Sequence, residues 1–149
     1  MKTIVIEWQR LLDEQKQTCP RCGSTEEEVE KAVQELNRLL KQSEIVVNLV
    51  KKAIDPASFQ KDVLQSNKIL IAGKTLEEWL GARTGQSKCC ETCGDAECRT
   101  VEYADETHEA IPADLIVGAG LAAAARLFGV KLPQMTERKP VVKIVSKRR

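Results

Sequence analysis

The sequence predicts an α/β fold in which strands and helices alternate along one chain of 149 residues. Short β-branched runs recur along the chain, and segments with apolar residues at helical spacing separate them. Hydrophobic residues make up 42% and charged residues 30%, which is typical of a globular protein. This length forms one domain with a hydrophobic core. We expect that domain to cover residues 1–130, followed by a tail over 131–149.

The first half predicts two strands around a long helix. Residues 3–8 and 45–50 are β-branched runs, as expected for strands. Between them, apolar residues at three- and four-residue spacing predict an amphipathic helix that ends near residue 42. Two capping boxes are available for its first turn, Ser24 with Glu27 and Thr25 with Glu28.

The second half continues this alternation. Pro56 favours the first turn of a short helix through about residue 65. Residues 68–72 predict a strand, and a turn at Gly73 leads to a short helical piece over 75–80. The remaining expected elements are a small hairpin from 100–103 and 107–110, and a helix over 112–128 that stops at Gly129.

Six cysteines form two groups. The first is Cys19-Pro20-Arg21-Cys22-Gly23, directly ahead of the long helix, and the second lies in a cysteine-rich extension at about 81–111. Because cytosolic proteins rarely hold structural disulfides, this number of cysteines favours redox chemistry or metal binding. The members of the second group are Cys89, Cys90, Cys93 and Cys98.

The first pair suits thiol–disulfide exchange. A cysteine at a helix N-terminus has its thiolate stabilised by free backbone N–H groups and the helix dipole. Cys19 would attack a disulfide, and Cys22, one turn away, would resolve the mixed disulfide. Arg21 would favour the thiolate further. These two residues are the predicted catalytic pair of a thiol–disulfide oxidoreductase, which requires no cofactor.

The same residues also suit a metal site. Gly23 completes a Cys-Pro-x-Cys-Gly knuckle, and Cys90 to Gly94 repeats the pattern, so two knuckles would supply four thiolates to zinc. In a second arrangement, the later cysteines bind one zinc by themselves or form disulfides that relay electrons to the first pair. An inert first pair and unpaired later thiols also remain open. None of the common iron–sulfur spacings is present.

Two motifs carry a family resemblance over about residues 1–80. Cys19-Pro20-Arg21-Cys22 ahead of the first helix, and the run 66–74 with its Gly-Lys turn, resemble the thioredoxin-like superfamily, in particular small glutaredoxin-like proteins. The resemblance implies a thioredoxin-like three-layer sandwich, here with a C-terminal cysteine-rich insertion, a hairpin and a helix. Where that family carries a residue followed by a cis-proline, this chain has Ser66-Asn67, which favours metal capture by the thiols. With its second cysteine group, the chain also resembles an uncharacterised prokaryotic family of unknown function.

Composition limits the partners. Aromatic residues make up only 3%, so a base-stacking surface for nucleic acid is not expected. The longest apolar run, 115–125, is about half of the roughly 20 residues that a membrane span needs, and residues 4–6 are too short for an export signal. We therefore expect a cytoplasmic protein whose partners are protein or small-molecule thiols and disulfides, or a metal ion. The tail carries a formal charge of +6 against −5 for the rest, as in a solvated tail or a scaffold contact.

Other polar candidates have structural interpretations. We expect His108 to be an exposed strand residue, and Glu77 and Glu78 to form the solvated face of a short helix. Gly118-Ala119-Gly120 predicts close helix packing rather than a dinucleotide site. The two tryptophans, Trp8 and Trp79, are expected in the core.

Overall fold

A computed structural model describes residues 2–11, 20–55, 57, 61–88 and 97–130. Its main sheet has four strands in the order β2-β1-β3-β4. β1 (Lys2–Leu11) and β2 (Ile45–Ile54) are parallel, whereas β3 (Lys68–Ile71) runs antiparallel to β1 and β4 (Lys74–Thr75) antiparallel to β3. Because β1 and β2 are parallel, the chain crosses over between them through a helix.

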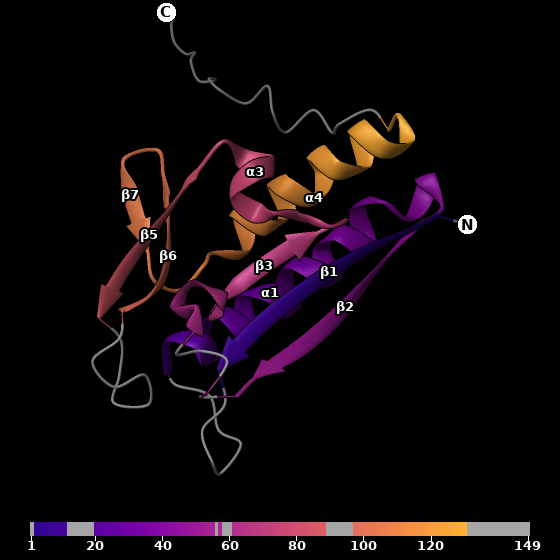
Figure 1. Ribbon diagram of the computed structural model, residues 1–149. Coiled ribbons are helices and arrows are strands. Elements are labelled where there is room, and N and C mark those ends of the chain that lie inside the picture. Colours follow the sequence, from indigo (N-terminus) through magenta and orange to yellow (C-terminus); the bar gives the residue numbers. More distant parts are fainter. Residues whose placement is uncertain (1, 12–19, 56, 58–60, 89–96, 131–149) are drawn as a thin grey trace, which may run out of the picture.

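That helix, α1 (Pro20–Leu39), covers one face of the sheet together with α4 (Ala113–Phe128) (Figure 1). The strands alternate accordingly. Ile4, Ile6 and Trp8 of β1 are buried on the helix-covered face, whereas Val5, between them, is 43% exposed. Apolar residues of α1 and α4 complete this core, which is mainly aliphatic as the composition predicts.

A second sheet lies beside the first. Its antiparallel strands are β5 (Arg83–Lys88), β6 (Glu97–Tyr103) and β7 (Glu106–His108), in that order. A short helix, α3 (Leu76–Leu80), leads into it, and two 3-10 turns, η1 (Lys41–Ser43) and η2 (Val63–Gln65), precede β2 and β3. Val101 of β6 is buried in the main core, so the second sheet shares that core.

The mixed α/β prediction is confirmed, and most predicted elements are present. β1 and β2 are longer than predicted, because Gln9-Arg10 and Lys51-Lys52 interrupt the apolar runs before each strand ends. The helix before Gly129 is confirmed, with Gly129 at φ +68° as its stop. A strand at 83–88 was not predicted, because Gly85 and polar residues obscure its alternation. The predicted helix at 56–65 lies partly outside the described residues, which include η2 at its end.

Within the described residues, α1 and α4 cover one face of the main sheet. The third layer of the predicted sandwich stays a prediction. The predicted capping boxes, in contrast, need correction. Neither predicted capping box starts the long helix, because α1 already begins at Pro20. Thr25 and Glu28 instead accept hydrogen bonds from the backbone N–H groups of Ile111 (3.1 Å) and Ala113 (2.8 Å).

Within the described part of the chain, no helix combines the length and apolar character that crossing a membrane requires. The apolar run 115–125 lies within α4, whose buried residues pack in the core. The predicted basic tail, 131–149, lies outside the described residues.

Candidate thiol site at the carboxyl end of the first strand

The predicted cysteines are only partly within the described structure. The backbone of Cys22 lies in the first turn of α1, and that of Cys98 lies in β6, opposite Ser87 of β5. Cys19, Cys89, Cys90 and Cys93 lie outside the described residues. The site is therefore built from the elements that carry and flank these cysteines.

The start of α1 supplies the first half of the site. The helix begins at Pro20, so Cys19 immediately precedes it and Cys22 is its third residue. Proline suits the first helical position, because its φ angle is helical and the N–H it lacks would have no partner there. The first turn contains no acidic residue. Its free backbone N–H groups and the helix dipole therefore favour a negative charge, such as a thiolate, at this end.

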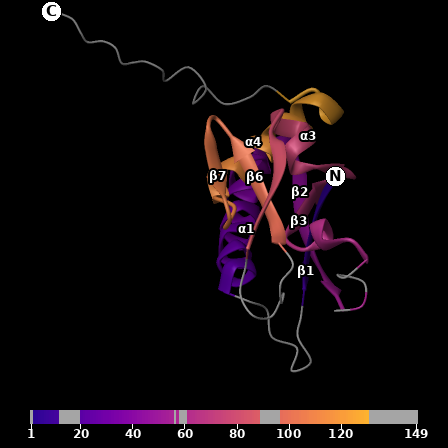
Figure 2. The same ribbon diagram turned by 60° about the vertical axis from the view of Figure 1, so that its left-hand side comes forward.

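Strands β5 and β6 supply the second half. Their last register pair before the cysteine-rich segment joins Lys88 to Glu97, and the next joins Ser87 to Cys98. The chain thus leaves one strand and re-enters its neighbour at the same end of the second sheet. Both views place this end beside the end of β1 and the start of α1 (Figures 1 and 2).

Arg99, the residue after Cys98, connects this hairpin to the rest of the molecule. Its side chain is only 8% exposed and forms an ion pair with the buried Glu77 of α3, at 3.0 Å. It also donates to the carbonyl oxygen of Leu64 in η2, at 2.8 Å, and to Thr84 Oγ1, at 3.3 Å. Since η2 precedes β3, whose first residue, Lys68, pairs with Gln9 near the end of β1, Arg99 ties the hairpin to the carboxyl end of β1.

Asn67 forms a second connection at this end. It is fully buried, its backbone has φ +61°, and its Oδ1 accepts a hydrogen bond from Trp8 Nε1 at 3.2 Å. Its Nδ2 donates to the carbonyl oxygen of Glu109 at 3.0 Å. With the bond between Thr25 and Ile111, this side chain joins β1, α1 and the segment before α4. Buried side chains therefore fix by hydrogen bonds both α1, which contains Cys22, and β6, which contains Cys98. We call these bonds of Arg99, Asn67 and Thr25 the hydrogen-bonded frame.

One predicted role is wrong at this frame. Glu77 was expected on a solvated helix face, but it is 6% exposed and pairs with Arg99, because a tertiary partner 22 residues away neutralises it. Glu78 is exposed as expected, and it forms a capping box with Thr75. Sequence analysis missed the roles of Arg99 and Asn67. A basic residue inside a β-run is a signal for the first, whereas the sequence carries none for the second.

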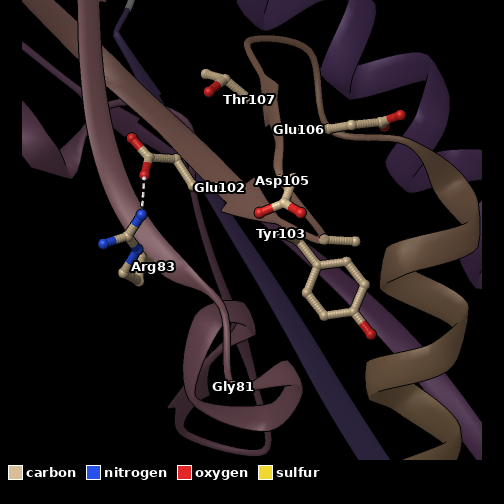
Figure 3. Close-up of a pocket in the computed structure, with 8 residues that line it drawn as sticks. Gly81, Arg83, Glu102, Tyr103, Asp105, Glu106 and Thr107 are labelled. Carbon is tan, nitrogen blue, oxygen red and sulfur yellow. Dashed lines mark ion pairs between the residues drawn. The ribbon is translucent and has the colours of Figure 1, made fainter.

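A surface hollow of about 530 Å³ lies at the opposite end of β6, around the β6–β7 turn (Figure 3). Arg83 is paired there with Glu102 at 3.2 Å. Tyr103, at the far end of β6, is five residues from Cys98, which is about 17 Å at about 3.3 Å per residue. The hollow is therefore separate from the thiol site. Its lining is acidic and polar: Gly81, Arg83, Glu102, Tyr103, Ala104, Asp105, Glu106 and Thr107.

The remaining candidates keep structural roles. His108 lies in β7, partly exposed, with Nε2 3.6 Å from Glu106 Oε1. Trp8 is buried as predicted, and Trp79 packs against the core and donates to the carbonyl oxygen of Ile71 at 2.7 Å. Gly120 faces Leu36 of α1, which confirms the predicted close packing at this position.

Comparisons with known proteins agree with part of the predicted resemblance. A family model described as "Domain of unknown function (DUF2703)" matches residues 4–120. The chain is also 39% identical over 113 residues to an uncharacterized protein of Archaeoglobus fulgidus, a match that covers 76% of this chain and 82% of the relative. No solved structure matches the chain.

Proposed function

Because the chain belongs to the family described as "Domain of unknown function (DUF2703)", whose description names no reaction, we propose its function from the cysteine geometry. We propose a thiol–disulfide redox protein that uses Cys19 and Cys22, with the later cysteines as a relay or metal site. The start of α1 at Pro20 is the observation that carries this proposal, because it puts the pair across a helix N-terminus.

The chemistry follows from this placement. The Cys19 thiolate attacks one sulfur of a substrate disulfide, the S–S bond breaks, and the displaced sulfur leaves as a thiolate. The Cys22 thiolate then attacks Cys19 in the mixed disulfide and releases the second substrate sulfur. Two electrons pass to the substrate, and the protein is left with a Cys19–Cys22 disulfide. A protein or small-molecule disulfide, met in the cytoplasm, is the proposed substrate class.

We also propose that residues 1–80 adopt a thioredoxin-like fold. The strand order β2-β1-β3-β4, with a parallel first pair and two antiparallel additions, supports this proposal. In the sequence the cysteine pair follows β1 and spans the first residue of α1, which supports the proposal further.

A metal-binding function is the second candidate. The start of α1 and the loop end of the β5–β6 hairpin lie side by side, which favours it. Two knuckles, Cys19 with Cys22 and Cys90 with Cys93, would supply the four thiolates that zinc prefers. Alternatively, the set Cys89, Cys90, Cys93 and Cys98 would hold the ion alone. Both sets contain only soft thiolate donors, which suit zinc or a thiophilic heavy metal.

Anaerobic purification followed by elemental analysis and a thiol count separates these functions. The redox proposal predicts that no metal protects Cys19 or Cys22, that two thiols appear only after reduction, and that these two are lost in Cys19→Ser. Reduction of a model disulfide should fall by about 100-fold or more in that variant, because the attacking thiolate is gone. A matched Cys98→Ser variant should keep most of this activity. About one zinc per chain with four protected thiols that include Cys19 and Cys22 would instead establish the metal function.

A further inference from the structure

Arg99 is a charged residue in a place where a strand ordinarily carries an apolar one. It precedes Thr100 and Val101, both 1% exposed, and is itself buried. Its three hydrogen-bond acceptors come from three elements: Glu77 in α3, Leu64 in η2 and Thr84 in β5. A guanidinium presents donors in a rigid planar fork, so it holds these acceptors in one relative arrangement.

The buried ion pair between Arg99 and Glu77 is not needed for stability alone. Burying two opposite charges costs desolvation that their attraction only partly offsets, and apolar replacements of similar volume are often equally stable. Val101, two residues further along β6, already fastens the second sheet in the core. The contribution of Arg99 is instead to geometry, because its three hydrogen bonds fix the position of the loop end of the β5–β6 hairpin.

We propose that Arg99 is a positioning residue, which acts with Glu77 to hold Cys98 at a set distance from the start of α1. The inference deepens, and rests on, the proposed thiol function, in which the second cysteine group exchanges electrons or shares a metal with the first. Either chemistry requires sulfur atoms from both groups to meet repeatedly in one geometry.

The distance between the two cysteine carriers tests this proposal directly. Nitroxide labels on Cys22 and Cys98, with the other four cysteines changed to serine, report the distance distribution by pulsed electron resonance. The test variant is Glu77→Leu with Arg99→Met, which removes both charges together and leaves neither unpaired. The matched control is Arg83→Met, since Arg83 also pairs with a glutamate of this sheet but is exposed.

We expect a narrow distribution in the parent and the control, and one about twofold broader in the double variant with unchanged circular dichroism. A double variant as narrow as the parent would overturn the proposal, as would equal broadening in the control. Should the double variant not fold, Arg99→Lys decides in the same way, because a single ammonium cannot hold three acceptors in a plane.

A functional readout separates this inference from the proposed function. With all cysteines present, the double variant should reduce a model disulfide at Cys19 at the parent rate. The Cys19–Cys22 disulfide that results should transfer to the second cysteine group about tenfold more slowly in the double variant. Timed alkylation and mass spectrometry measure the rate of this transfer. An unchanged rate of transfer would contradict the positioning role. Loss of model-disulfide reduction in the parent would contradict only the proposed function, because the distance measurement does not depend on it.

Discussion

Asn67 joins three parts of the chain through one buried side chain. Its amide accepts from Trp8 and donates to Glu109, and its backbone adopts a left-handed conformation that asparagine tolerates better than most residues. At this position the thioredoxin-like resemblance would place a proline. The Asn67 side chain therefore forms hydrogen bonds that a proline, which has no polar side-chain atom, could not form.

Asn67→Ala should lower the free energy of unfolding by about 2–4 kcal/mol, because it removes the acceptor of the buried Trp8 Nε1–H and strains a backbone at φ +61°. Urea unfolding measures the change. Asn48→Ala, at an exposed position of β2, is the control and should stay within about 0.5 kcal/mol. A similar loss in both variants would show that the buried hydrogen bonds are not the cause.

Arg99 and Arg83 show how burial changes the effect of the same ion pair. Arg99→Met alone leaves the buried Glu77 without its partner, so we expect a loss of about 3–5 kcal/mol. Arg83→Met breaks an exposed pair and should cost less than about 1 kcal/mol. Chemical denaturation of both variants checks the difference. Equal losses would be inconsistent with a buried, tightly bonded Arg99.

At the scale of elements, the packing of α1 against α4 depends on a glycine. A Cβ added at Gly120 would lie 2.5 Å from Leu36 Cδ1, and Leu36 is fully buried. The same addition at Gly118 would meet nothing within 4 Å. The two glycines share a helix and differ only in what they face.

Gly120→Ala should therefore destabilise the protein by about 1–3 kcal/mol through overpacking. Gly118→Ala should stabilise it by up to about 1 kcal/mol, because alanine is the better helix former. Thermal and urea unfolding of the two variants gives the comparison. A gain of stability in both would show that the two helices are not in close contact at Gly120.

A carboxylate also links these two helices. The Ala113 N–H, at the start of α4, lowers the pKa of Glu28 below its ordinary value of 4.5, and a hydrogen bond from Lys31 contributes further. Since the folded pKa is below the unfolded one, this contribution is complete above pH 4.5 and disappears as the pH falls through the folded pKa.

Glu28→Gln should therefore cost about 0.5–1 kcal/mol at neutral pH, because a charge near a helix N-terminus is lost. The difference from the parent should shrink as the pH falls below 4.5. Urea unfolding over a pH series measures it, with Glu27→Gln, an exposed neighbour, as the control. A difference that does not change with pH would contradict an ionic contribution.

At the scale of the whole molecule, two sheets share one core, and the start of α1, with Cys22, lies on the same side as the end of β5 and the start of β6, with Cys98. The start of α1 lies beside the end of β1 in the main sheet. The loop end of the β5–β6 hairpin in the second sheet lies next to it (Figure 2). Arg99 of the second sheet bonds Glu77 of α3 and the carbonyl oxygen of Leu64 in η2, which precedes β3 of the main sheet. Both proposed chemistries use this arrangement.

The sequence by itself determined the α/β class, the long helix, the helix that ends at Gly129 and the cysteine spacing. These features depend on local periodicity, turn residues and the order of residue types, which can be read without knowing neighbours in space. The buried tryptophan Trp8 was predictable for the same reason. The family resemblance, too, rested on short contiguous motifs.

Only the tertiary structure decided the strand at 83–88, the burial of Glu77 and the place of Arg99. A charged side chain becomes a core residue only when an opposite charge and suitable carbonyl groups meet it, and here those partners come from distant segments. The bonds of Thr25 to Ile111 and of Asn67 to Glu109 are likewise long-range. No local pattern encodes such pairings, because their free energy exists only once the elements are packed.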